Sequence, residues 1–158
     1  MSLICIFRRG YMMIIEEALK KQGFAFEVIR NEKMIYTAQE GAEYFQIDLA
    51  QIAPTLILYT SKGFYSAILS GVNRLDFKAI KNVLHCHNVR MATESEIAQV
   101  TGFSVGNIPM FGLNIPCFVD AKLLEYDFIY GGLGKEKMTL KVDPHALLKL
   151  NSIVEILQ

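Results

Sequence analysis

The chain has 158 residues, of which 52% are hydrophobic and 20% charged, and this globular composition predicts a single domain over residues 1–158. Sixteen basic side chains balance sixteen acidic ones, so the chain lacks the basic excess of proteins that bind nucleic acid tightly on their own. Three widely spaced cysteines form no disulfide framework and favour a reducing cytoplasm, and no apolar run approaches the roughly 20 residues that span a bilayer.

The first predicted helix covers residues 13–23, where apolar side chains share one face and acidic residues precede basic ones by four positions. Gly23 is well suited to end this helix. The preceding residues 1–12 allow three interpretations, which are a short first strand, a cloning remnant, and a start chosen upstream of Met12 or Met13.

Alternating apolar residues predict a strand at 24–29. Thr37 and Glu40 have the spacing of a capping box, and a helix is expected at about 38–45. This part of the chain therefore combines helix and strand within a few tens of residues.

A β-hairpin is predicted from the apolar runs 55–60 and 64–70, which flank a three-residue loop that contains glycine. Asp76 is suited to cap a following helix, and Thr93 with Glu96 forms a second capping box, for a helix that ends near residue 101.

Further short strands are expected at 103–105, 117–120, 127–130 and 138–142. Asp143 followed by Pro144 predicts the start of a C-terminal helix, with Ile153 on its apolar face. Strands and short helices mix without a repeating βαβ unit, so the predicted fold class is α+β with a mixed, mostly antiparallel sheet.

Two glycine-rich segments contain much backbone freedom beside large apolar residues. The first is "TGFSVGNIPMFG" at 101–112, which has no acidic or basic side chain, and the second is "YGGLGKEK" at 130–137. Each could be a flexible loop, or each could bring its backbone close to a ligand, with Lys135 or Lys137 available for an anion. Two such segments in one small domain favour a shared pocket.

The remaining candidate metal ligands and nucleophiles give little indication of a site. His85, His87 and Cys117 match no usual zinc spacing, and an exposed loop is the favoured interpretation of the histidines. Cys86 and Cys117 are each expected to be buried and unreactive rather than nucleophilic. The chain has no G-x-S-x-G nucleophile motif and no phosphate-binding loop, so neither a metal nor another cofactor is predicted.

Four stretches, in this order, resemble the YbaK family of aminoacyl-tRNA editing domains, which is related to the insertion domain of bacterial prolyl-tRNA synthetases. They are "EALKKQGFAFEVIRNEKMIYTAQEGAEYF", "APTLILYT", "TGFSVGNIPMFG" and "DAKLLEYDFIYGGLGKEKMTLKV". The glycine–proline segment with its "TGF" lead-in is the most specific of them. The resemblance extends from Met13 to the C-terminus and leaves residues 1–12 outside.

The resemblance implies a barrel-like mixed sheet with a pocket that hydrolyses the ester of a mischarged tRNA, such as cysteinyl- or alanyl-tRNA(Pro). Aminoacyl-tRNA is the implied partner, with a synthetase such as prolyl-tRNA synthetase as a second, and no membrane is involved. A positioned water and the substrate's own neighbouring hydroxyl would suffice for the chemistry. The implied substrate-binding residues are Thr55, Gly106, Asn107, Ile108, Pro109, Met110, Phe111, Gly112, Gly131, Gly132 and Gly134.

This sequence departs from the family's pattern at three positions. Pro54 occupies the position of the functional lysine, Asn107 that of the second loop glycine, and Met110 that of the second proline. Lys62 cannot replace the lysine, because eight residues of strand place it roughly 25 Å away. Lys135, on the second glycine-rich segment, is a weak candidate, and the catalytic residue stays unknown.

Three hypotheses follow. The chain is a deacylase that works without the usual lysine, a catalytically silent module that binds aminoacyl-tRNA or an aminoacyl-adenylate, or an interaction module that docks on a synthetase. The last of these predicts a filled pocket and an exposed apolar patch. A basic patch for tRNA would draw on Lys20, Lys21, Lys78, Lys81, Lys135 and Lys137.

Overall fold

A computed structural model describes the backbone of residues 3–158 and the side chains of residues 10–158. The helices are α1 (Leu3–Gln22), α2 (Ala38–Phe45), α3 (Phe77–Leu84), α4 (Glu94–Thr101) and α5 (Ala146–Leu150), with short 3-10 helices η1 (Leu49–Gln51) and η2 (Ala121–Glu125). The strands are β1 (Phe26–Arg30), β2 (Ile52–Ala53), β3 (Thr55–Thr60), β4 (Gly63–Ile68), β5 (Val89–Met91), β6 (Cys117–Asp120), β7 (Ile129–Gly132), β8 (Met138–Val142) and β9 (Ile153–Leu157).

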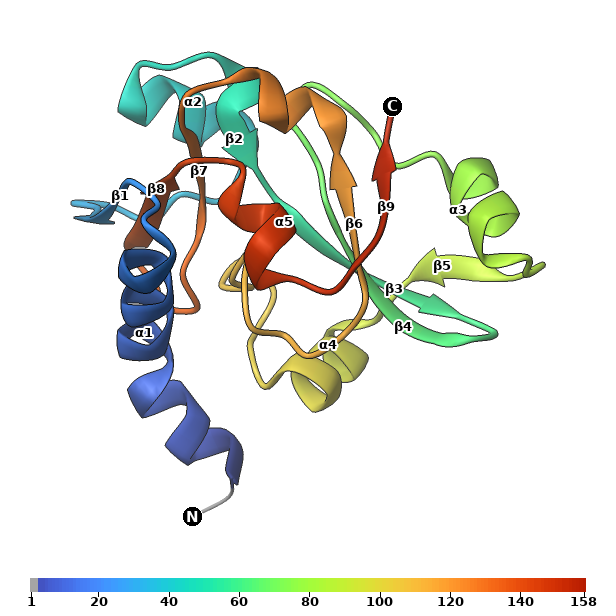
Figure 1. The fold of residues 1–158 in the computed structure, drawn as a ribbon. Coiled ribbons are helices and arrows are strands. Elements are labelled where there is room, and N and C mark those ends of the chain that lie inside the picture. The colour runs from blue at the N-terminus through green and yellow to red at the C-terminus, as the bar shows by residue number, and fades with distance from the viewer. Residues whose placement is uncertain (1–2) are drawn as a thin grey trace.

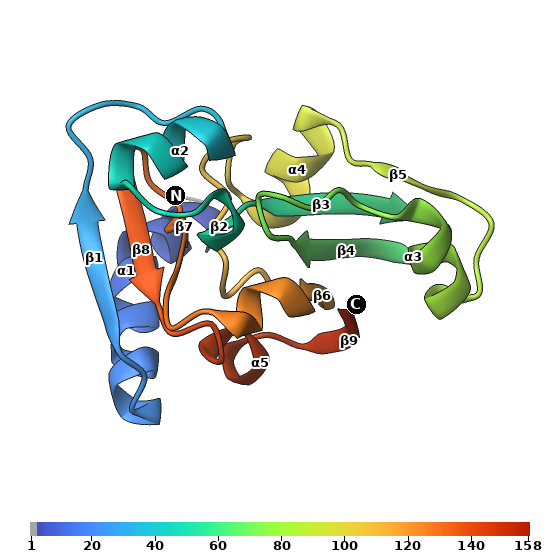
Figure 2. The ribbon, with the colours of Figure 1, turned by 90° about the horizontal axis from the view of Figure 1, so that it is seen from above.

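The strands form two mixed sheets, shown from two directions in Figures 1 and 2. One sheet has the order β1-β8-β7-β2, and the other has the order β5-β3-β4-β6-β9. Pairs β2–β7, β4–β6 and β6–β9 are parallel, and the remaining pairs are antiparallel. The predicted α+β class with a mixed sheet is confirmed, and the described strands curl without closing into one barrel.

Pro54 lies where the chain passes from one sheet to the other. Strand β2 ends at Ala53 in the first sheet, and β3 begins at Thr55 in the second, so β2 runs almost directly into β3 in Figure 1. Proline has no N–H group, so it suits a residue that belongs to neither ladder. Its carbonyl still accepts a hydrogen bond from the Leu69 amide, at 3.1 Å.

The helices that were predicted from capping residues form where expected. The Thr93 hydroxyl accepts from the Glu96 amide and the Glu96 carboxylate accepts from the Thr93 amide, which completes a capping box for α4. At α2 the Thr37 hydroxyl likewise accepts from the Glu40 amide, but the Glu40 carboxylate reaches back one residue further, to the Tyr36 amide. These bonds join residues three or four apart, so they depend little on the rest of the fold.

Two differences from the sequence prediction lie at the ends of the chain. The helix α1 starts at Leu3, so a short first strand within residues 1–12 is wrong. The C-terminal helix starts at Ala146 rather than directly after Asp143, whose carboxylate accepts from the His145 amide in a preceding turn. The helix also stops at Leu150, and Ile153 lies in β9 instead, because that segment pairs with the buried strand β6.

Three further differences concern glycine and its neighbours. No strand forms at 103–105, where the Thr101 hydroxyl accepts from the Phe103 amide and the chain then turns. The hairpin loop has two residues rather than three, because Gly63 pairs with Thr60. The strand predicted at 127–130 lies two residues later, and it includes Gly131 and Gly132, which were predicted to be part of a loop.

The core beside the first sheet joins α1 to the first glycine-rich segment. Met110 and Phe111 are almost completely buried, and the Tyr11 hydroxyl of α1 donates to the Phe111 carbonyl. Burial raises the pKa of Tyr11 far above its usual value, so this hydroxyl remains a donor at all ordinary pH values. The packing fixes one end of the segment, while residues 105–108 remain at the surface of a cavity.

Candidate functional site

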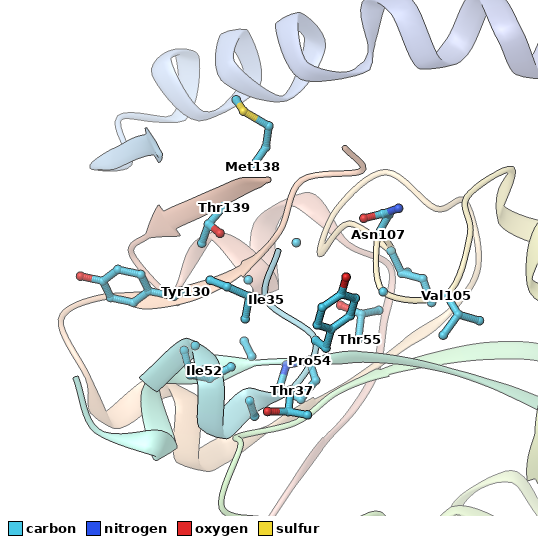
Figure 3. A pocket seen from close by; sticks show the side chains of 18 of the residues that line it. Ile35, Thr37, Ile52, Pro54, Thr55, Val105, Asn107, Tyr130, Met138 and Thr139 are labelled. Carbon is cyan, nitrogen blue, oxygen red and sulfur yellow. The ribbon is translucent and has the colours of Figure 1, made fainter. Parts of the chain in front are cut away.

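A cavity of about 360 Å³ is lined by residues of both sheets, and Figure 3 shows it from close by. Four parts of the chain supply most of the lining: the segment from Asn31 into α2, the β2–β3 crossing, residues 105–108, and the β7–β8 hairpin with its turn. Met91 of β5 and Ile97 of α4 complete it. Most of the lining side chains are apolar, among them Ile35, Ile52, Ile57, Ile97, Val105 and Met138. The size and character are those of a small-molecule site.

The two glycine-rich segments meet beside this cavity. The Met110 amide donates to the Gly132 carbonyl at 3.3 Å. A Cβ atom on Gly131 would overlap the Met110 side chain, and one on Gly132 would overlap the Ile108 carbonyl oxygen. The two segments therefore share one pocket as predicted. Gly132 is required for contact with the Ile108 backbone, and Gly131 for contact with the Met110 side chain.

The predicted binding residues divide into two groups. Thr55, Gly106, Asn107, Ile108, Gly131 and Gly132 line the cavity, as do Pro54 and Lys135. The cavity lining does not include Pro109, Met110, Phe111, Gly112 or Gly134.

The second group has structural surroundings that explain its composition. Pro109, Met110 and Phe111 are buried, two of them in the core beside α1. Gly112 has φ of 77° and faces the Tyr11 ring, and Gly134 has φ of 83° and faces the Phe103 ring. These positions hold the segments in place, and a left-handed φ is a reason for glycine at both of the last two.

Thr55 carries an unusual polar atom. Its side-chain oxygen Oγ1 is buried and has no hydrogen-bond partner among the described residues, although Thr55 lines the cavity. Leaving a buried hydroxyl unpaired costs about 1–3 kcal/mol, and most buried polar atoms in proteins are satisfied. Figure 3 shows Pro54, Thr55, Val105 and Asn107 around the same space. The Thr55 hydroxyl is therefore an unpaired polar group in a residue that lines the cavity.

The charges of the lining are all positive. The described lining contains no Asp, Glu, His or Cys side chain, whereas Lys135 and Lys137 both belong to it. Lys62 lies in the turn between β3 and β4, at the opposite end of β3 from Thr55, as its sequence distance predicts. The site thus offers ammonium groups, hydroxyls and amides, but no carboxylate or imidazole as a general base.

The cysteines whose side chains the structure describes, and the histidines, lie outside the cavity lining. Cys86 and Cys117 are buried and outside the cavity lining, and burial raises the pKa of the Cys117 thiol to about 11. An unreactive thiol is the consequence, as predicted. His85 ends α3 in a left-handed conformation. Within the described part of the chain, no three His, Cys, Asp or Glu side chains group as metal ligands, and no helix is long and apolar enough to cross a membrane.

The six lysines proposed as a basic patch do not form one surface. Lys20 and Lys21 lie in the last turn of α1, whereas Lys78 and Lys81 lie on α3. Both views in Figures 1 and 2 place α1 and α3 at opposite ends of the molecule. Lys135 and Lys137 line the cavity instead.

Several lining residues were not singled out from the sequence. Asn31, Ile35, Tyr130 and Thr139 belong to this group, together with Thr37, which the sequence predicted only as a helix cap. Asn31 accepts a hydrogen bond from the Thr139 hydroxyl at 3.1 Å, across 108 positions of the chain. No local signal predicts such a pair, because it depends on β1 pairing with β8.

Comparison with known proteins gives a consistent result. Residues 32–150 match the family described as "Aminoacyl-tRNA editing domain". Proline–tRNA ligase of Solidesulfovibrio magneticus is 28% identical over 110 residues, which cover 68% of this chain and 19% of that protein. Proline–tRNA ligase of Thermosipho africanus is 24% identical over 124 residues, which cover 77% of this chain and 22% of that protein. The chain thus spans about a fifth of the length of these relatives.

Solved structures resemble the whole fold. The hypothetical protein APE2540 superposes with a TM-score of 0.81 at 29% identity, covering 90% of this chain and 97% of that one. A structure described as "a putative trans-editing enzyme for prolyl tRNA synthetase" superposes with a TM-score of 0.78 at 27% identity, covering 94% of this chain and 97% of that one.

Proposed function

This chain belongs to the aminoacyl-tRNA editing domain family, and from this premise we propose that it hydrolyses the ester of mischarged tRNA in trans. The substrates that we propose are tRNA(Pro) species that carry a small wrong amino acid, such as alanine or cysteine. The similarity to proline–tRNA ligases and to the trans-editing structure supports this choice. Such a protein would act in the cytoplasm, on charged tRNA that prolyl-tRNA synthetase has released or presents.

The observation that carries the proposal is the buried, unpartnered Thr55 hydroxyl beside an open, mostly apolar cavity. The apolar part of the lining suits the small side chain of the amino acid, and the Thr55 hydroxyl supplies a donor for the ester carbonyl. Gly106 supports the same placement, because the space beside its Cα is open and its φ of 88° suits glycine. The 105–108 segment therefore lets a ligand come close to its backbone.

The proposed reaction is a simple acyl transfer to water. A water oxygen attacks the ester carbonyl carbon, and the carbonyl oxygen takes up negative charge as the tetrahedral intermediate forms. The Thr55 hydroxyl donates to this oxygen. The carbon–oxygen bond to the ribose then breaks, and the departing ribose oxygen receives the proton that the water gives up. The products are a free amino acid and tRNA with both terminal hydroxyls restored.

The proton in this scheme moves through the substrate. The described lining contains no carboxylate and no imidazole, so the chain offers no strong base beside Thr55. The neighbouring ribose hydroxyl is held next to the ester in any aminoacyl-tRNA, which makes it an efficient intramolecular relay. This scheme assigns binding and electrostatic stabilisation to the protein and proton transfer to the tRNA.

A silent binding module is the second candidate, and Pro54 favours it. Proline at the β2–β3 crossing places no amine in the cavity, so the site could retain a ligand without turning it over. The third hypothesis, a docking module without a site, predicted a filled pocket. The open cavity of about 360 Å³ argues against it.

A deacylation assay separates these candidates. Purified tRNA(Pro) charged with alanine, cysteine or serine is incubated with wild-type protein and with Thr55→Val, and release of the amino acid is followed. We expect release by the wild type and a large loss in the variant. Binding of the charged tRNA without any release above the protein-free control would support the silent module instead. Absence of both binding and release would remove the proposal.

A further inference from the structure

Polarity is unevenly distributed around the cavity. Its interior is mostly apolar, with the Thr55 hydroxyl buried within it, whereas the exposed residues Lys135 and Lys137 lie in the turn between β7 and β8. No acidic side chain belongs to the described lining. A ligand that matches this arrangement has a small apolar group for the interior and a negative charge for the rim.

The turn holds Lys137 in a backbone conformation that lysine rarely adopts. Its φ is 58°, in the left-handed region that favours glycine and asparagine. The Lys137 carbonyl accepts a hydrogen bond from the Asn31 amide at 2.7 Å, which ties the turn to the end of β1. A lysine at such a position is structurally unfavourable, and strained residues of this kind concentrate at functional sites.

The second electropositive feature near the cavity is already neutralised. The N-terminus of α2 reaches the lining through Thr37 and Ala38. Its capping groups are in place, because the Thr37 hydroxyl accepts from the Glu40 amide and the Glu40 carboxylate accepts from the Tyr36 amide. An anion at the rim would therefore meet the Glu40 carboxylate near α2. At the β7–β8 turn it would meet two lysine ammonium groups, while the exposed Glu136 carboxylate between them in the sequence lies outside the lining.

We propose that Lys135 and Lys137 bind the 5′-phosphate of the terminal nucleotide while the side chain of the amino acid occupies the apolar interior. This inference rests on the proposed function and adds to it a second point of recognition. Phosphate and ammonium at an exposed rim attract each other with a strength that salt reduces. The two lysines would hold the substrate in register, and Thr55 would act on the ester.

The test uses a pair of non-hydrolysable probes. These are 3′-alanylamido-3′-deoxyadenosine with and without a 5′-phosphate, and isothermal titration calorimetry measures the dissociation constant of each. We expect the wild type to bind the phosphorylated probe at least about tenfold more tightly, as suits hydrogen bonds to charged groups. Lys135→Gln and Lys137→Gln should each reduce this ratio.

Two further variants control for overall charge and for folding. Lys62→Gln changes an exposed lysine in a turn outside the cavity, so it should retain the wild-type ratio. Lys137→Gly removes the side chain from a left-handed position, so it should fold at least as stably as the wild type and still lose phosphate discrimination. A lower ratio in that variant cannot then be attributed to unfolding.

The outcomes distinguish the inference from the proposed function. Equal binding of both probes by the wild type would overturn the role of the two lysines, even where deacylation of charged tRNA persists. An equal decrease of the affinity ratio in Lys62→Gln and Lys137→Gln would overturn this role as well, since the effect would then come from the overall charge of the protein. If the wild type neither deacylates charged tRNA nor binds either probe, both the proposed function and the role of the two lysines would be excluded.

Discussion

The Gly132 backbone lies directly against the Ile108 carbonyl oxygen, and no space remains between them for a Cβ atom. This contact joins the second glycine-rich segment to the first, at one side of the cavity. Gly132 lies in β7, whereas Ile108 lies in the irregular segment after α4. The position of this part of the cavity wall therefore requires glycine at residue 132, because any side chain there would displace Ile108.

Gly132→Ala tests this contact. The added methyl group must displace the Ile108 backbone, so we expect the free energy of unfolding to fall by about 1–3 kcal/mol and deacylation to fall with it. Chemical denaturation measures the first effect. Gly10→Ala is the control, because its Cβ would meet nothing closer than 3.9 Å within a helix, and alanine there should be neutral or stabilising. Equal stability of both variants would contradict the structural account.

Thr55→Val should separate stability from activity. Valine keeps the shape of threonine but removes a buried hydroxyl that has no partner among the described residues, so stability should stay equal or rise. Loss of one donor to the developing oxyanion should lower kcat by about 100-fold. Thr55→Ser, which keeps the hydroxyl, should retain most activity. A fully active Thr55→Val would exclude the proposed donor.

Pro54→Lys introduces an amine into the cavity lining. Proline donates no hydrogen bond, and its carbonyl bond to the Leu69 amide does not depend on the side chain, so the substitution breaks no ladder. The added ammonium group would stabilise the negative charge that develops on the ester carbonyl oxygen, so the rate of deacylation should rise. Pro54→Ala separates the effect of the amine from loss of the ring. Unchanged turnover in both variants would show that an amine at this position does not assist the reaction.

Tyr11→Phe tests the support that α1 gives to the first glycine-rich segment, from outside the matched residues 32–150. The variant leaves the buried Phe111 carbonyl without its donor while the ring still packs edge-on against Phe103. Unfolding free energy should fall by about 1–2 kcal/mol, measured by chemical denaturation. Tyr36→Phe, at a position 77% exposed, should change stability little. Equal effects of the two would show that the hydrogen bond is unimportant.

Acid should weaken the cap of α4. The Arg90 guanidinium and then the Thr93 amide lower the pKa of Glu96 from 4.5 to about 2 in the folded protein. This contribution to stability is therefore present above pH 4.5 and is lost as the pH falls towards 2. Since the pair is exposed, the effect should be small.

Denaturation series between pH 5 and 2 provide the measurement for this cap. Glu96→Gln should lose less stability over that range than the wild type does, because it has no carboxylate to protonate. Glu94→Gln, in the same first turn of α4, is the matched control and should follow the wild type. Identical acid sensitivity in all three proteins would rule out a contribution from Glu96.

The elements that depend on neighbouring residues could be predicted from the sequence. Thr37 and Thr93 mark the starts of α2 and α4, and a short glycine-containing turn marks the hairpin of β3 and β4. In each case the decisive hydrogen bonds join residues a few positions apart, so the local sequence contains the whole interaction. The pairing of the two glycine-rich segments was also predicted, from composition rather than from geometry.

Only the tertiary structure decided which residues of the two glycine-rich segments face the cavity. Met110 and Phe111 pack into the core and Ile108 lines the pocket, although the three are close in sequence. The same is true of the C-terminus, where parallel pairing with β6 makes a strand of a segment that was predicted as helix. Side-chain direction in an irregular segment and the pairing of distant strands both follow from packing of the whole chain, which no short window contains.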